Sequence, residues 1–201
     1  MRRPRFLRSS GPPDPAAAPA AAPAPDPRAA ERADRRRALA REHGWTYTER
    51  HQRAIQGWPR TALPPGPLGR VRDVVSGRHR GRPFFLFDYV HRRAADLPDR
   101  TLLVYAVELP VRVPYLYVQD RDGGAHGLYA ESPDSEFAVE LLSEGVREDI
   151  RRHGITDLVL DGDRLICAGA DPGTTDPARR LDALVELVGH VPADVWSRWG
   201  R

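Results

Sequence analysis

The segment 71–118 constrains the fold most, because strand signals follow one another along it. Four stretches are rich in the aromatic and β-branched residues that strands favour, at 74–75, 84–90, 102–109 and 115–118. Arg80-Gly81 joins the first two, which predicts a β-hairpin. The stretch 102–107 is apolar without alternation, as in a central strand covered on both faces or partly covered by a helix. Pro110 and Pro114 bracket the next predicted turn.

A second hairpin is predicted near the C-terminus. Residues 155–160 and 164–168 both have strand character, and Asp161-Gly162 stands between them. The pair Asp-Gly tolerates the positive φ angles of a tight hairpin turn. It is the best hairpin signal in the chain.

Helices are predicted before, between and after these strands. The first begins at Asp26-Pro27 and ends at Gly44, with an apolar stripe so thin that we expect a peripheral helix. The middle helix opens at Ser132-Pro133-Asp134, with Gly145 as a point where it divides; its expected apolar face is Val139, Leu142, Val146 and Ile150. The last helix follows Asp176-Pro177, and its expected face is Leu181, Leu184, Val185 and Val188.

This order of elements predicts an α+β fold. We expect a largely antiparallel sheet of hairpins with a peripheral N-terminal helix, a middle helix and a C-terminal helix. Residues 1–26 are dominated by proline, alanine and arginine, and cannot bury enough apolar surface to offset chain entropy. We therefore expect a disordered tail over 1–26 and a single domain over 27–201.

Three stretches of this sequence resemble an uncharacterised family of small α+β proteins from GC-rich bacteria. They are Gly44-Trp45-Thr46-Tyr47, the strand ending in Ser76-Gly77, and the segment from Gly81-Arg82-Pro83 to Asp88-Tyr89. The resemblance covers about 150 residues and implies a fold, without catalytic residues. Some members look membrane-anchored through a helix ahead of this domain, where the tail stands here.

Charge is distributed unevenly along the chain. All 31 basic residues are arginine, and residues 31–201 hold equal numbers of arginines and acids, so the net charge of +3 comes from residues 1–30. Within the neutral part, residues 70–93 carry +5 and residues 120–163 carry −8. The simplest interpretation is that these two blocks face each other in the fold. The alternative is that the basic block is open to a partner.

Several kinds of chemistry are excluded or disfavoured by the motifs. A chain without lysine has no Walker-type phosphate loop, and a G-x-S-x-G nucleophile motif is missing. The seven histidines show neither H-x-x-x-H nor H-E-x-x-H spacing, and Cys167 is the only cysteine. We therefore expect no catalytic residue, no metal site and no cofactor, and favour a non-enzymatic function.

The remaining candidate site is the predicted basic hairpin 70–93. It would use Arg78, His79, Arg80 and Arg82 around its turn and Arg92 and Arg93 after its second strand. Guanidinium groups suit phosphate or carboxylate. An anionic ligand or a membrane surface is therefore a possible partner. Nucleic acid is disfavoured, because no recognition helix and no stacking aromatics accompany these arginines.

Three functions stay open from the sequence. The first is an interaction or scaffolding module in the cytoplasm with a protein partner; the second is an anion-binding module, peripheral at the inner membrane; the third is an enzyme of unrecognised chemistry. Surface shape separates them. A concave pocket with converging polar groups favours a small-ligand binder or an enzyme, and a flat apolar patch favours a protein partner.

Overall fold

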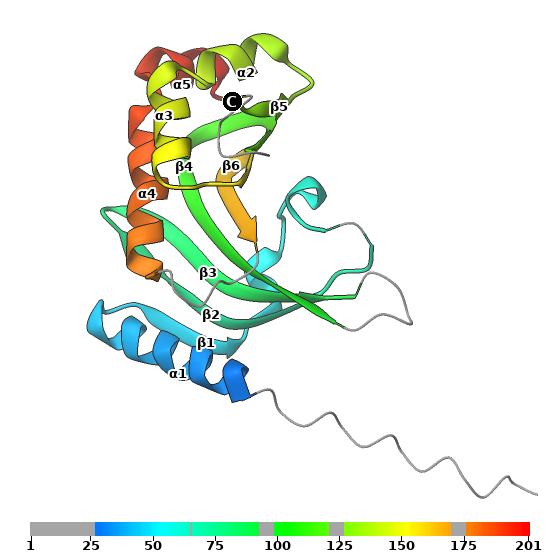
Figure 1. Ribbon diagram of the computed structural model, residues 1–201, viewed down its shortest axis with the longest axis vertical. Coiled ribbons are helices and arrows are strands. Elements are labelled where there is room, and N and C mark those ends of the chain that lie inside the picture. Colours follow the sequence, from blue (N-terminus) through cyan, green and yellow to red (C-terminus); the bar gives the residue numbers. More distant parts are fainter. Residues whose placement is uncertain (1–26, 65, 93–98, 121–126, 170–175) are drawn as a thin grey trace, which may run out of the picture.

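The computed structural model describes residues 27–64, 66–92, 99–120, 127–169 and 176–201. In these residues six strands form one antiparallel sheet, which confirms the α+β prediction (Figure 1). The strands are β1 (Thr46–Arg50), β2 (Arg70–His79), β3 (Arg82–His91), β4 (Arg100–Gln119), β5 (Tyr129–Glu131) and β6 (Asp157–Gly169). β4 is central: β6 pairs along one edge, and β3 and then β5 pair along the other.

The predicted hairpin at Arg80-Gly81 is confirmed as β2–β3. His79 pairs with Arg82, and both turn residues have positive φ, 47° at Arg80 and 81° at Gly81. These values belong to a primed two-residue turn, whose twist matches that of the flanking strands. Glycine adopts this conformation without strain, which explains its place in the turn.

The second predicted hairpin is wrong, and so is the predicted turn between Pro110 and Pro114. Residues 157–169 form one strand, β6, which pairs with the equally continuous β4 from Leu103↔Gly169 to Gln119↔Asp157. The register shifts where Gly162, at φ 59°, lies opposite Val113. Proline and left-handed glycine are tolerated at such irregularities. These local turn signals therefore mark a bend in a long two-stranded ribbon.

Five α-helices accompany the sheet in the described residues: α1 (Pro27–Glu42), α2 (Ser135–Leu141), α3 (Glu144–Arg152), α4 (Pro177–His190) and α5 (Ala193–Trp199). The middle helix does divide, but at Leu142-Ser143 and not at the predicted Gly145, which lies within α3. Asp134 caps α2 by accepting a hydrogen bond from the Phe137 amide at 3.1 Å. The predicted inward position of Val139 is wrong: its side chain is 69% exposed, because Phe137 and Leu141 set the buried face of this short helix.

The two faces of the sheet carry different covers. The helix-covered face packs against α2–α5 through large side chains, among them Leu116, Leu160, Leu181 and Leu184. The loop-covered face packs against two 3₁₀ helices, η1 (Gln52–Ile55) and η2 (Arg60–Ala62). Figure 1 shows α3 and α4 on one side of the sheet and these short helices, in cyan, on the other. Trp58 pins this loop, with its ring 5.4 Å from that of Phe87.

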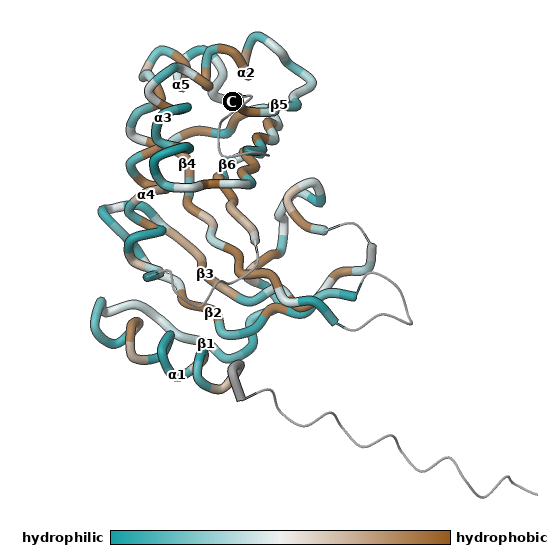
Figure 2. The backbone as a smooth tube through the Cα atoms, viewed as in Figure 1, coloured by the Kyte–Doolittle hydropathy of each residue, from teal (hydrophilic) through white to brown (hydrophobic). Residues whose placement is uncertain are grey.

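Helix α1 is attached to the helix-covered face mainly through charge. Figure 2 shows it mostly hydrophilic, whereas brown, hydrophobic stretches lie in β3 and β4. Arg36, whose side chain is 5% exposed, donates to Asp88 Oδ1 at 2.6 Å and to the Asp73 carbonyl at 3.1 Å. Ala40 supplies a small apolar contact beside them. A buried ion pair thus supplements the thin apolar stripe.

None of the helices in the described residues is long and apolar enough to cross a membrane. The expected tail, residues 1–26, lies outside the described part of the chain.

Candidate functional site

A cleft of about 510 Å³ opens on the loop-covered face of the sheet. One group of lining residues is apolar and includes Ala62, Leu63, Leu102, Ile166 and Ala168. The other carries the polar groups of Tyr115, Tyr117, Glu131 and Asp157.

The bend in the β4–β6 ribbon creates this cleft. In a straight strand Leu102 and Tyr117 would lie roughly 50 Å apart, at about 3.3 Å per residue. Both line the same cleft, so β4 must curve strongly between them. Val113 and Gly162 mark where the pairing shifts. The features that imitate turns in the sequence therefore shape the site.

Strand register gathers the polar group around Tyr117. Val159 of β6 lies opposite it on one side, and Glu131 of β5 lies opposite on the other. Directly paired residues of antiparallel strands present their side chains on the same face. Two residues further along β4, Gln119 pairs with Asp157. Three strands thus contribute polar side chains to one end of the cleft.

Hydrogen bonds fix these side chains in place. The Tyr117 hydroxyl donates to Asp157 Oδ1 at 2.8 Å, and Gln119 Nε2 donates to the same oxygen at 3.2 Å. At the rim the Thr61 hydroxyl donates to Asp161 Oδ2 at 2.9 Å, which ties η2 to β6. The cleft is therefore held from both sides, by the strands and by the loop.

The electrostatic environment of the cleft is negative. The pKa of Tyr115 is raised, first by burial and then by the negative charges of Glu131 and Asp161. Tyr115 therefore stays a neutral phenol at ordinary pH. Glu131 and Asp157 are the charged side chains among the twelve that line the cleft, and none of the twelve is basic.

The predicted basic hairpin divides into two places. Arg78, His79, Arg80 and Arg82 gather at the β2–β3 turn, whereas Arg92 follows the far end of β3. Arg93 lies outside the described residues. The five described residues of the six named from the sequence therefore do not converge on one point.

At the turn, an acidic side chain of helix α4 contacts two of the basic side chains. Asp182 of α4 lies 2.8 Å from His79 Nε2 and 2.7 Å from Arg80 Nε. Arg78 is exposed and donates to the Gly81 carbonyl at 2.5 Å. Arg82 reaches the Glu108 carbonyl at 3.4 Å.

At the other end of β3, Asp99 forms ion pairs with both nearby arginines, at 2.9 Å from Arg92 and 2.5 Å from Arg70. Arg92 above all lowers the pKa of Asp99. These residues line a small hollow of about 240 Å³.

The expected pairing of the basic block with the acidic block 120–163 is not what these contacts show. The acids that pair with these arginines, Asp182 and Asp99, both lie outside that block. Within it, Glu140 pairs with Arg198 and accepts from Trp199 Nε1 at 2.8 Å. In these contacts the basic block pairs with Asp182 of α4 and with Asp99, and Glu140 of the acidic block pairs with α5.

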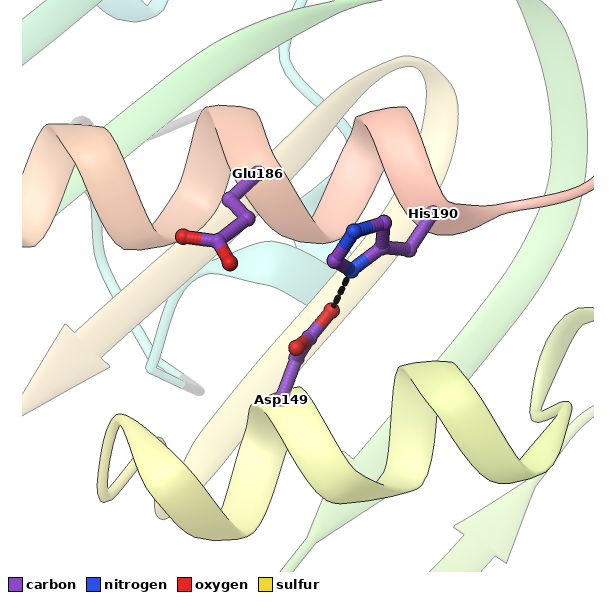
Figure 3. A group of neighbouring side chains, drawn as sticks. All are labelled: Asp149, Glu186 and His190. Carbon is purple, nitrogen blue, oxygen red and sulfur yellow. Dashed lines mark hydrogen bonds and ion pairs between the residues drawn. The ribbon is translucent and has the colours of Figure 1, made fainter.

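A second polar cluster joins α3 to α4. Asp149, Glu186 and His190 bring their ligand atoms within 4.8 Å of one another, and Figure 3 shows His190 pointing at Asp149. Arg152 already lies 3.1 Å from Asp149 Oδ1 and 3.3 Å from Glu186 Oε1. Asp149 is fully buried, so its charge needs this compensation. Because a guanidinium supplies the positive charge that a metal would bring, we assign this cluster to helix packing.

Sequence reasoning missed the cleft residues, although one signal for them is present. Tyr115, Tyr117 and Gln119 alternate with the buried Leu116 and Val118. This period of two indicates a strand with one polar face.

Comparison with known proteins informs the fold. No protein-family model and no curated protein matches the chain. Among solved structures, the chain is similar to the crystal structure of the mycobacterial trehalose monomycolate transport factor A. The TM-score is 0.56 at 17% sequence identity, covering 82% of this chain and 93% of that one. At this identity the likeness shows a shared fold alone, and the resemblance to an uncharacterised bacterial family stays a prediction.

Proposed function

We propose that this chain is a non-enzymatic binding module that holds a small amphipathic molecule in the cleft of the loop-covered face. The cleft itself carries the proposal. Its volume of about 510 Å³ lies within the range of roughly 300–1,000 Å³ typical of small-molecule sites. Its lining combines apolar walls with a few converging polar groups, which is the composition of such sites.

The two groups of lining residues indicate an amphipathic ligand. Leu102 and Ala168 belong to one half of the β4–β6 ribbon, and Tyr117 and Asp157 belong to the other half. A molecule with an apolar part and a polar head matches this division. An entirely apolar molecule would leave buried polar groups without partners, which is costly.

Binding accounts for the polar side chains better than catalysis does. Asp157 is held by two hydrogen bonds to one oxygen, from Tyr117 and Gln119, as expected of a fixed acceptor. Cys167 is buried in the core on the helix-covered face, and burial raises its pKa to about 11. It is therefore a protonated thiol at neutral pH, which is a poor nucleophile.

A small ligand also fits the surface better than a scaffold for protein partners. Among the described residues, the exposed large apolar side chains are Leu68, Tyr129 and Val139, on three separate segments. They do not make the continuous apolar patch of a protein interface. The similar structure is named a transport factor, a role that a binding domain can serve.

The proposal is tested by measuring probe binding before and after tryptophan substitutions that fill the cleft. Binding of decyl-chain probes with cationic, neutral sugar and anionic heads is measured by titration calorimetry on the full chain, below the micelle concentration of each probe. Val159→Trp and Ala168→Trp place an indole in the cleft from different positions on β6. Val139→Trp, on the exposed face of α2, is the matched control.

We expect at least one probe to bind the wild-type chain and the control alike, and both cleft variants to bind it at least about tenfold more weakly while keeping a cooperative thermal transition. If no probe binds, or if a folded cleft variant binds as well as Val139→Trp, the proposal is wrong. Two blocking positions are used so that the misfolding of one does not decide the result.

A further inference from the structure

The cleft has a charge that is unusual for this chain. The chain contains 31 arginines, yet the charged side chains among the twelve lining residues are two carboxylates, Glu131 and Asp157. Asp161 stands at the rim, where it accepts from Thr61. A site for an anionic head would place arginine here, as guanidinium groups suit phosphate and carboxylate.

The two carboxylates stand on either side of the central strand. Glu131 lies on β5 opposite Tyr117, and Asp157 lies on β6 opposite Gln119. With neighbouring strands about 4.8 Å apart, they flank β4 at a separation of roughly 10 Å. A head group seated over Tyr117 would lie between two negative charges. Glu131 is exposed and Asp157 is half-buried, so the two carboxylates attract a cation at the open end of the cleft, and salt will screen that attraction.

Aromatic rings surround the same place. Tyr117 and Tyr129 meet edge to face with their ring centroids 6.4 Å apart, and Tyr115 lines the cleft beside them. The face of an aromatic ring attracts a cation within about 6 Å. Tyr115 adds no negative charge of its own, since its pKa is raised.

We propose that the polar head of the ligand is an organic cation, an amine or a quaternary ammonium group, held between Glu131 and Asp157 over the tyrosine rings, with its apolar part against Leu102, Ile166 and Ala168. This inference rests on the proposed function of the cleft and names the chemical class of its ligand. An anionic head is repelled by both carboxylates. A neutral sugar head gains hydrogen bonds but no net charge attraction.

The test compares heads on one tail. Decyltrimethylammonium, decyl maltoside and decyl sulfate share their apolar chain and differ in head charge, so their affinities for the full chain isolate the head. We expect the cationic probe to bind at least about tenfold more tightly than the maltoside, and the sulfate to bind most weakly. Raising the salt concentration should weaken the binding of the cationic probe alone, because dissolved ions screen the attraction between opposite charges.

Charge-removing variants assign the effect to the cleft. Asp157→Asn and Glu131→Gln should each lower the affinity for the cationic probe about fivefold or more and change maltoside affinity less than twofold. Asp194→Asn, an exposed acid on α5, is the matched control. Unchanged maltoside binding shows that the cleft has kept its shape, so a loss for the cation alone reports charge.

The outcomes separate this inference from the proposed function. If the maltoside binds as tightly as the ammonium probe, or if both charge variants keep their affinity for the cation, the cationic head is wrong while the cleft remains a binding site. If tryptophan in the cleft leaves all three probes unaffected, or if none of the three binds, the proposed function is wrong and the inference falls with it.

Discussion

The two faces of the sheet are built from the same strands but pack against different elements, α-helices on one face and short 3₁₀ helices with their loop on the other. On the helix-covered face Leu181, Leu184 and Leu187 of α4 are completely buried. On the loop-covered face the cover consists of short 3₁₀ helices, with Ala54 and Ala62 among its buried residues. The α-helices cover the first face closely, whereas the short 3₁₀ helices and their loop leave a cleft on the second. We therefore expect stability to depend mainly on the helix-covered face and the proposed binding to use the loop-covered face.

The largest predicted effect is on the helix-covered face. Leu184→Ala removes a side chain that is 0% exposed in the centre of the main core. It should lower the free energy of unfolding by about 2–5 kcal/mol, the range for truncating a buried leucine. Urea unfolding at unchanged m-value measures this. A loss of a few tenths of a kcal/mol would show that α4 is peripheral and remove the contrast between the faces.

The same truncation on the loop-covered face should cost less. Leu63 is 7% exposed and lines the cleft beside η2. Its removal enlarges a space already open to solvent and leaves no closed cavity. We expect Leu63→Ala to lower the free energy of unfolding by about 1–2 kcal/mol and to weaken binding of the decyl probes. A loss equal to that of Leu184→Ala, measured by the same urea titration, would mean that the loop is as firmly packed as the helices.

Sequence reasoning succeeded where the deciding signals are local. The β2–β3 turn follows from Gly81, and the buried face of α4 follows from leucines three residues apart. It failed at Asp161-Gly162, because a local turn signal cannot report that β6 finds a continuous partner in β4.

Long-range contacts explain what was missed in the attachment of α1 and in the cleft. Arg36 and Asp88 are 52 residues apart in the chain, so their buried pair leaves no pattern in α1. The cleft likewise depends on pairing Tyr117 with both Glu131 and Val159. The alternation of Tyr115 and Tyr117 was visible, but its partners were not.

Alkaline pH should test the polar contacts at α1, which differ from the apolar attachment of α4. Arg37 of α1 lies 5.0 Å from the centroid of the Tyr47 ring in β1. Burial, and then the hydrogen bond to Asp73, raise the pKa of Tyr47 from 10.0 to about 12. A raised pKa means that the folded state favours the protonated phenol. Its contribution is thus complete below pH 10 and is lost as the pH rises from 10 to 12.

The melting temperature of the wild type should therefore fall more steeply between pH 10 and 12 than that of Tyr47→Phe. Both proteins, with and without Tyr47→Phe, also carry Cys167→Ala. Burial raises the pKa of the Cys167 thiol from 9.0 to about 11, so its ionisation would lower the stability of the protein in an overlapping pH range. Parallel curves would show that the Tyr47–Asp73 contact between β1 and β2 contributes nothing to stability.

The smallest expected effect is at the basic hairpin, which belongs to neither cover. Of the side chains removed in the triple variant Arg78→Ser, Arg80→Ser, Arg82→Ser, Arg78 is exposed, Arg80 is 60% exposed and pairs with Asp182, and the half-buried Arg82 makes one long hydrogen bond of 3.4 Å to the Glu108 carbonyl. Exposed ion pairs contribute about 0–1 kcal/mol. The free energy of unfolding should therefore change by no more than about 1 kcal/mol. Retention on heparin tests whether the arginines bind anions as a group.

The control for retention removes the same charge elsewhere. Arg41, Arg50 and Arg53 are exposed arginines on α1, β1 and η1, and their triple serine variant matches the hairpin variant in net charge. We expect the two triple variants to elute from heparin at the same salt concentration, since Asp182 already compensates His79 and Arg80. Earlier elution of the hairpin variant alone would revive the anion-binding alternative. It would also give the molecule a second binding region, outside the cleft and of opposite charge.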